Sequence, residues 1–298
     1  MPVLSPPKLQ NGSAVPILIY GTTIHTPPHP QPDIIQSLQS GFFGIDTASS
    51  QKFHNEARDG DAIQTAFSQR IISRESLLVQ TKYTSPYGQP TDQASWPYRV
   101  QDSHSLRVLK SFSRSVQDLK VGAIDVYFLH SPLESLDDTL EIWRTLEDVV
   151  LQGGVRYLGL CNVDAATLGD LSNEATIKPA FVQNPLRRRD AGYDVEVVRF
   201  CQQTGIVYQV FGLFWSRNQE LFGCQLVRDL IQQGATMHQA LIGSLTEAAR
   251  EIGLQLCILS GTTSKSHMEE NIAALNLDIK IEPASMAGFL ELLGWDNI

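Results

Sequence analysis

The sequence lacks several features that would each point to a different class of protein. Its 4 cysteines form no CxxC pair and show no metal-ligand spacing, so we expect reduced thiols and neither a disulfide framework nor a metal site. Acidic residues outnumber lysine and arginine by 32 to 23, and the resulting net charge of −9 argues against a nucleic-acid surface. The cysteines are Cys161, Cys201, Cys224 and Cys257.

Long apolar runs are also lacking. No stretch approaches the ~20 apolar residues that a membrane-spanning helix needs. Residues 1–10 contain prolines where a secretion signal would need an apolar core. From these absences we expect a cytoplasmic protein whose partners are small molecules, with no nucleic-acid or membrane partner. Its oligomeric state stays open.

Eight short apolar runs alternate with longer amphipathic segments, a pattern typical of βα units around a parallel sheet. Leucine and other apolar residues recur at three- and four-residue spacing within 106–119, 140–150 and 236–252, which predicts helices there. Another helix is expected to begin near Ser266. The runs predicted as strands are 16–20, 43–46, 77–82, 124–130, 155–160, 180–183, 206–211 and 256–259.

The closed (β/α)8 barrel is favoured over the rival α/β fold, an open doubly wound sheet. An open sheet of that kind usually carries a glycine-rich turn after its first strand. Here Gly21-Thr22-Thr23 supplies one glycine, and no GxGxxG follows anywhere. No linker divides the chain, so we predict one barrel domain over residues 1–298.

Three ionisable residues are predicted at the carboxyl ends of neighbouring strands, where barrel enzymes carry their chemistry. Asp46 ends the second predicted strand, Lys82 the third and His130 the fourth. A single such residue is most often a turn or core side chain. Three at one end of one barrel favour a catalytic site.

The segments around these residues resemble the ordered motifs of the aldo-keto reductases, from about residue 16 to residue 276. The cofactor-phosphate segment, SGTTS at 260–264 followed by HMEEN at 267–271, is similar to that of a fungal-type branch. The other matching segments are GIDTA at 44–48, QTK at 80–82, DVYFLHSP at 125–132 and GVRYLG at 154–159.

This resemblance implies a nicotinamide dinucleotide, NADP(H) by family expectation, with NAD not excluded. Asn162 and Gln183 match positions that bind the nicotinamide carboxamide, and Phe211 stands where an aromatic ring stacks on the nicotinamide. A helix beginning after Ser264 would offer backbone N–H groups to a phosphate. The remaining residues matched to the phosphate and adenine end are Gly261, Thr262, Thr263, Ser264, His267 and Asn271.

One member of the family's catalytic set is missing. In the family a tyrosine donates the proton. This chain has either Phe53 or His54 at that position, depending on which branch of the family supplies the spacing. We favour His54, the position that the spacing of the fungal-type branch gives, whereas Phe53 would offer no proton. The predicted catalytic set is therefore Asp46, His54, Lys82 and His130. The Lys82 charge nearby would lower the pKa of His54 and leave its ring mostly neutral at neutral pH.

Three functions fit this altered set. The first is NAD(P)H-dependent reduction of an aldehyde or ketone, aromatic or polyketide-like in character. The second is a non-redox isomerase, dehydratase or cyclase, and the third is a cofactor-binding regulatory protein resembling the β subunits of potassium channels. Arg187-Arg188-Arg189 is either a solvated run or a partner for an acidic substrate. The residues expected to line the substrate mouth are His25, Tyr87, Trp96, Phe214 and Trp215.

Overall fold

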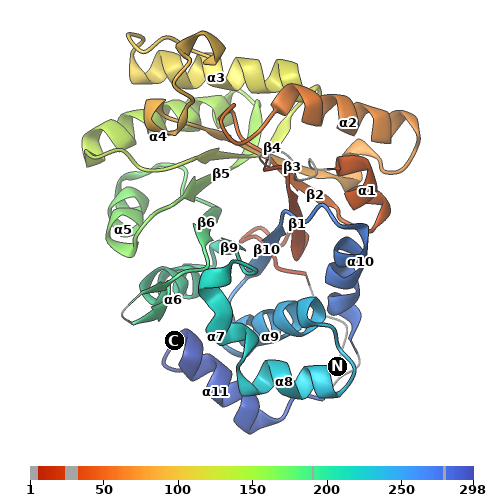
Figure 1. Ribbon diagram of the computed structural model, residues 1–298. Helices are drawn as coiled ribbons and strands as arrows, with labels where there is room; N and C mark the ends of the chain where they lie inside the picture. The colour runs from red at the N-terminus through yellow and green to blue at the C-terminus, as the bar shows by residue number, and fades with distance from the viewer. Residues whose placement is uncertain (1–5, 24–32, 190, 278–279) are drawn as a thin grey trace.

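The computed structural model of the protein describes residues 6–23, 33–189, 191–277 and 280–298. Eight parallel strands close into a barrel in the order β1-β10-β9-β6-β5-β4-β3-β2, and the helices surround it (Figure 1). The predicted (β/α)8 class is thus confirmed. The barrel strands are β1 (Leu18–Gly21), β2 (Gly44–Asp46), β3 (Leu78–Tyr83), β4 (Ile124–Leu129), β5 (Val155–Cys161), β6 (Phe181–Pro185), β9 (Val207–Phe211) and β10 (Leu256–Ser260).

Each of the eight predicted apolar runs coincides with one barrel strand, with ends that differ by at most two residues. The runs are continuous because both faces of a barrel strand are covered, one by the barrel interior and the other by helices. All six residues of β4, for example, are buried. Buried strands of this kind are therefore visible in the sequence without any alternation of polar and apolar residues.

The helices follow the strands in the βα order, and side-chain caps define several of their starts. Thr236 and Gln239 form a capping box at the start of α9, and Gly253 follows that helix with a φ of 73°, the left-handed turn expected there. The helices are α1 (Ile34–Gln39), α2 (Glu56–Ser68), α3 (His104–Leu119), α4 (Leu136–Leu151), α5 (Ala165–Glu174), α6 (Val195–Thr204), α7 (Gln219–Phe222), α8 (Gln225–Gln232), α9 (Met237–Glu251), α10 (Lys265–Ala273) and α11 (Pro283–Leu293).

The structure adds elements that the sequence pattern did not predict. A two-stranded antiparallel sheet, β7 (Arg188–Arg189) with β8 (Gly192–Tyr193), follows β6. The short helices α7 and α8 precede α9, and α11 packs against α8 (Figure 1). The indole N–H of Trp295 donates to the Tyr193 carbonyl at 2.8 Å, which ties the C-terminal segment to β8.

The barrel interior changes from apolar to polar along the strands. Successive inward positions of β3 are Leu78, which packs in an apolar cluster with Phe128 and Phe181, then Gln80, and then Lys82. The apolar layer closes the amino-terminal end of the barrel, since filled interiors of this fold are packed cores. Polar side chains therefore concentrate at the carboxyl ends of the strands. Within the described residues, no helix is both long and apolar enough to cross a membrane.

Two glycines in helices test this packing. A Cβ at Gly60 of α2 would overlap the Asp118 carbonyl oxygen and lie 2.8 Å from the Leu119 Cα at the end of α3, whereas one at Gly288 of α11 would meet no atom of the described residues within 4 Å. We predict that Gly60→Ala lowers the free energy of unfolding by about 1–3 kcal/mol through overpacking. Gly288→Ala, the matched control, should raise it by up to ~1 kcal/mol through helix propensity. Urea denaturation measures both, and equal effects would contradict the α2–α3 contact.

Candidate active site

A buried ion pair lies at the carboxyl ends of β2 and β3. The Lys82 ammonium donates to Asp46 Oδ1 at 2.6 Å and to the Thr47 carbonyl at 2.8 Å. The Lys82 and Asp46 side chains are 3% and 6% exposed. Such a pair is costly to desolvate and needs further hydrogen bonds to hold it. The predicted convergence of Asp46 and Lys82 is therefore found, and it places a fixed positive charge inside the barrel mouth.

Three buried glutamines support the pair from below. Gln80 and Gln183 each donate from Nε2 to Asp46 Oδ1, at 2.7 and 3.0 Å. The same two amides donate to Gln209 Oε1 at 2.8 and 2.9 Å, and Gln209 Nε2 donates back to Gln80 Oε1 at 2.9 Å. Asp46 Oδ1 thus accepts from three donors. The network fixes the carboxylate and, through it, the position of the Lys82 ammonium.

His130 follows β4 and faces the same cleft. Its Nδ1 lies 2.7 Å from the Thr84 hydroxyl, which leaves Nε2 for a ligand. Burial, followed by the Lys82 charge, lowers the pKa of His130 to about 3. The ring is consequently neutral at physiological pH, and with Thr84 donating to Nδ1 it would offer an Nε2–H donor.

His54 lies just before α2, also buried and also beside the Lys82 charge. Its Nδ1 is 3.3 Å from the Thr22 hydroxyl at the end of β1. Burial first, then Lys82 and Arg58, lowers the pKa of His54 well below its usual value. Phe53 is 42% exposed and faces a neighbouring hollow next to His130, while His54 lines the cleft with Lys82.

The cleft at this end of the barrel has a volume of about 490 Å³ and extends from Lys82 to the start of α10. Gly21 and Gly261 line it with bare backbone, and the nearest atom to a Cβ at either would be the other segment's backbone oxygen, at 3.9 and 3.6 Å. Of the residues predicted to contact a cofactor, six line the cleft: Asn162, Gln183, Phe211, Gly261, Thr262 and His267.

The other three predicted cofactor residues lie near the cleft without lining it. Ser264 is the N-cap of α10 and its hydroxyl accepts from the His267 N–H at 3.5 Å, and Thr263 precedes it. Asn271 is fully buried and donates to the Ser260 hydroxyl at 2.7 Å. These residues shape the start of α10, and their contact with a cofactor stays a prediction.

The structure also brings in His238, which the sequence did not single out because it lies within the predicted helix of α9. Its ring stacks on Phe214, with centroids 4.3 Å apart, and lies 4.1 Å from the ring of His267. Asn271 Oδ1 is 3.1 Å from His238 Nδ1 and so holds the stack in place. No spacing in the sequence links α9 to α10, so this aromatic wall could be found only in three dimensions.

The predicted substrate-mouth residues separate into groups. Phe214 and Trp215 line the cleft, and Tyr87 lines the adjacent hollow next to His130. Trp96 is absent from the cleft lining, and its indole N–H donates to the Pro90 carbonyl at 2.7 Å. His25 lies outside the described residues.

The arginine run is exposed and does not line the cleft. Arg188 instead pairs with Glu220 at 2.9 Å. The solvated interpretation of the run is therefore the one that the geometry favours.

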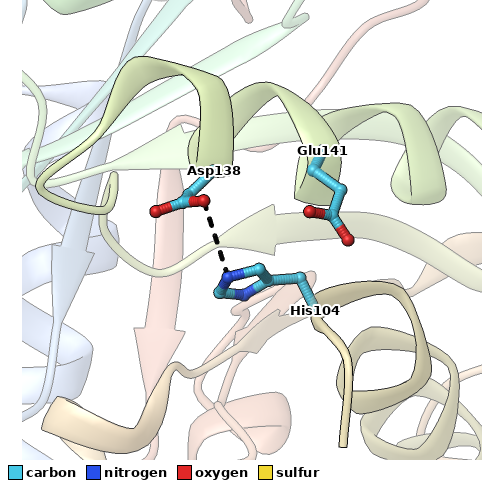
Figure 2. Close-up of side chains that lie close together, drawn as sticks. All are labelled: His104, Asp138 and Glu141. Carbon is cyan, nitrogen blue, oxygen red and sulfur yellow. Dashed lines mark ion pairs between the residues drawn. The ribbon is translucent and has the colours of Figure 1, made fainter.

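One group of three side chains among the described residues could contact a single metal ion, and it is separate from the cleft. His104 begins α3, and Asp138 and Glu141 lie in the first turns of α4 (Figure 2). His104 Nε2 is 3.8 Å from Asp138 Oδ1, and the Asp138 side chain is 51% exposed. The partial positive charge at the start of α4 opposes a cation here. A surface contact between His104 and Asp138 accounts for the group, and the prediction of an active site without metal stays a prediction.

Comparison with known proteins identifies the class that this fold and site define. The family model described as "Aldo/keto reductase family" matches residues 29–215. The chain therefore belongs to the aldo/keto reductase family. The resemblance seen in the motifs is confirmed at the level of the family.

Individual relatives are distant. The chain is 25% identical over 225 residues to aldo-keto reductase family 1 member A1 of Gallus gallus, covering 68% of this chain and 62% of that protein. An aldo-keto reductase from a Medee basin deep-sea metagenome library has the same fold, with a TM-score of 0.76, 21% identity and coverage of 98% and 96% of the two chains. The Bombyx mori aldo-keto reductase AKR2E5, solved in complex with NADPH, has a TM-score of 0.73 and 22% sequence identity to this chain. The match covers 96% of this chain and 86% of that chain.

The buried ion pair generates a prediction about stability. Asp46→Asn leaves a buried ammonium without its anion, and Lys82→Met leaves a buried carboxylate without its cation, so each should lower the free energy of unfolding by about 3–5 kcal/mol. The double variant should lose less than the sum of the two, because it leaves neither charge unpaired. Urea denaturation of the four proteins gives the coupling energy, and strict additivity would show that the pair does not interact.

Proposed function

We propose that the protein reduces an aldehyde or ketone with NADPH or NADH, and that His54 takes the place of the family's tyrosine proton donor. One observation carries the proposal. A buried ammonium, Lys82, and two imidazoles, His54 and His130, line a single cleft together with the residues that match the family's nicotinamide contacts.

The residues present fit a nicotinamide ring. Both Nε2 hydrogens of Gln183 are used by Asp46 and Gln209. Among the described residues, its Oε1 accepts from the weak donor Cys161 Sγ alone, at 3.7 Å, and can therefore accept from a carboxamide. Asn162 has a φ of 53° and donates to the His130 carbonyl at 2.8 Å, which fixes its side chain beside the cleft. Phe211 offers an aromatic face. When bound, the cofactor would supply a hydride to the carbonyl carbon, or take one from the carbinol carbon in the reverse direction.

The far end of the cleft fits the rest of a dinucleotide. Gly21 and Gly261 leave room for a close approach to backbone, and α10 begins there. The first N–H groups of a helix have no acceptor within the helix, and at this one the His267 N–H donates to the Ser264 side chain. Among the described residues that line the cleft, Lys82 is the one lysine or arginine, and His238 and His267 stand at the far end. The charges that line the cleft therefore do not select NADPH over NADH, and NADPH is expected from the family alone.

Each polar side chain of the cleft would then have its own role in the reaction. His130 Nε2 would orient the carbonyl oxygen, and Lys82 would stabilise negative charge developing on it. His54 would deliver the proton from its cationic form. Because the pKa of His54 is well below its usual value, that form is scarce at neutral pH.

The substrate is proposed to be an apolar, aromatic or polyketide-like carbonyl compound, since Phe214 and Trp215 line the cleft and Tyr87 the hollow beside it. The non-redox alternative has one observation in its favour: His130 and His54 both have lowered pKa values, so neither carries a spare proton at neutral pH. The regulatory alternative has no such support.

The pH profile tests the role of His54. In single turnovers with NADPH and activated aldehydes or ketones, we predict that the rate rises about tenfold per pH unit from pH 8 down to 6, because only the imidazolium donates. His54→Gln should lose both the rate and this slope. His54→Tyr should restore a donor that stays protonated, and its profile should be flat over this range. A flat wild-type profile would contradict the role.

Binding is measured separately, by quenching of tryptophan fluorescence, since Trp215 lines the cleft. All three proteins should bind NADPH. Binding without turnover, and no rescue by His54→Tyr, would favour the non-redox or regulatory function. Absence of binding would overturn the assignment of Asn162, Gln183 and Phe211.

A further inference from the structure

Asp59 is a buried carboxylate on α2 that is linked to His54 through the Thr22 hydroxyl. None of the roles given above uses it. Its side chain is 1% exposed, and Oδ2 accepts from two hydroxyls, Thr22 Oγ1 at 2.6 Å and Thr47 Oγ1 at 2.8 Å. Oδ1 accepts from Arg58 Nη2 at 3.3 Å. The two threonines follow β1 and β2 directly, so the carboxylate joins α2 to the strand ends that form the cleft.

The number of hydrogens available to these hydrogen bonds determines which ring nitrogen of His54 carries a hydrogen. A threonine hydroxyl carries one hydrogen, and Thr22 gives its hydrogen to Asp59. Thr22 Oγ1 can then only accept from His54 Nδ1, 3.3 Å away. A neutral imidazole with a hydrogen on Nδ1 has a lone pair on Nε2, the nitrogen left for a ligand in the cleft.

We infer that Asp59 and Thr22 are positioning residues that fix His54 as the Nδ1–H tautomer, so that the cleft contains a general base suited to alcohol oxidation. This inference rests on the proposed function for its substrate class, an alcohol corresponding to the carbonyl compound. The proton of the alcohol O–H passes to His54 Nε2, and the electron pair of that bond forms the second bond of the carbonyl as the carbinol C–H bond breaks and its hydride passes to the oxidised nicotinamide. The imidazolium later releases the proton to solvent.

The charges around His54 agree with a base. Burial is the main cause that disfavours a cationic ring and lowers the pKa of His54, and the charges of Lys82 on β3 and Arg58 on α2 act in the same direction. His130 is neutral beside it. The nearby carboxyls do not offset these effects at the ring: Asp46 is bonded to Lys82, and Glu56 accepts from the Thr81 and Ser115 hydroxyls at 2.6 and 3.0 Å.

The tautomer can be observed directly. Long-range ¹H–¹⁵N spectra of the full chain with ¹⁵N-labelled histidine distinguish a ring nitrogen that carries a hydrogen from one that carries a lone pair. The sequence has 7 histidines, and the resonances lost in His54→Gln identify those of His54. At pH 7 we expect a neutral ring with the hydrogen on Nδ1. A hydrogen on Nε2, or a cationic ring, would overturn the inference.

The substitution Asp59→Asn tests whether Asp59 sets the tautomer of His54. Arg58 can only donate, so the asparagine oxygen must face Arg58 and its NH₂ must face Thr22. Thr22 would then accept from the amide and give its own hydrogen to His54 Nδ1, which moves the histidine hydrogen to Nε2. An unchanged tautomer in a folded Asp59→Asn protein would contradict the relay.

Two matched variants at Thr22 cover the case in which Asp59→Asn does not fold. Thr22→Val removes the acceptor while keeping the shape of the side chain, and the ring should no longer be held as the Nδ1–H tautomer. Thr22→Ser keeps the hydroxyl and should keep the wild-type tautomer. If Thr22→Val retains the wild-type spectrum, the hydroxyl does not set the tautomer.

Activity gives the second readout. Asp59→Asn should slow alcohol oxidation with NADP⁺ at neutral pH by up to about 10⁴-fold, the scale of a wrong-tautomer substitution in a hydrolase triad, with cofactor affinity unchanged. A weakened cofactor affinity with an unchanged rate in single turnovers would overturn the inference. If no variant shows any redox turnover, the proposed function fails, while the wild-type and Asp59→Asn spectra still decide whether the relay exists.

Discussion

The buried ion pair between Lys82 and Asp46 is the constraint on which the rest of the site depends. Two charges taken out of water are stable only when their remaining hydrogen-bonding positions are occupied. Gln80, Gln183 and the Thr47 carbonyl occupy them here. The ammonium that results is fixed, and it contributes to the lowered pKa values of His54 and His130.

The two imidazoles show this effect most clearly. His54 is buried and His130 is partly buried, and both lie beside the Lys82 ammonium, so both pKa values fall below the ordinary value for histidine. A tyrosine beside the same ammonium would become a stronger acid and still carry its proton at neutral pH. A histidine in that environment loses its extra proton. Under the proposed replacement of the family's tyrosine by His54, the resting state of the site would change from proton donor to proton acceptor.

The fold follows closely from the sequence because its determinants are local. Continuous apolar runs predict strands buried on both faces, and eight of them, with no dinucleotide fingerprint, predict a barrel. Asp46, Lys82 and His130 could be predicted from their position at strand ends. The hairpin β7–β8 was not predicted, since two-residue strands leave no periodic signal.

The supporting contacts could not be predicted from sequence. The hydrogen bond from Gln80 to Gln209 joins residues 129 positions apart in the sequence, and that from Thr22 to Asp59 joins residues 37 positions apart. His238 reaches the cleft only because α9 packs beside α10. Such contacts depend on how strands and helices are arranged around the closed barrel, and no motif records them. The choice of His54 over Phe53 likewise rested on spacing alone, whereas the coordinates put His54 in the cleft with Lys82.

Burial and the fixed Lys82 charge together keep both imidazoles neutral. A titration of the histidine ring resonances by NMR, in the wild type and in Lys82→Met, tests it most directly. We predict that His54 and His130 of the wild type stay neutral at pH values where an exposed histidine is already charged, and that both pKa values rise in the variant. Ordinary titration of either ring near pH ~6.5 in the wild type, or no response to the loss of the ammonium, would contradict the account.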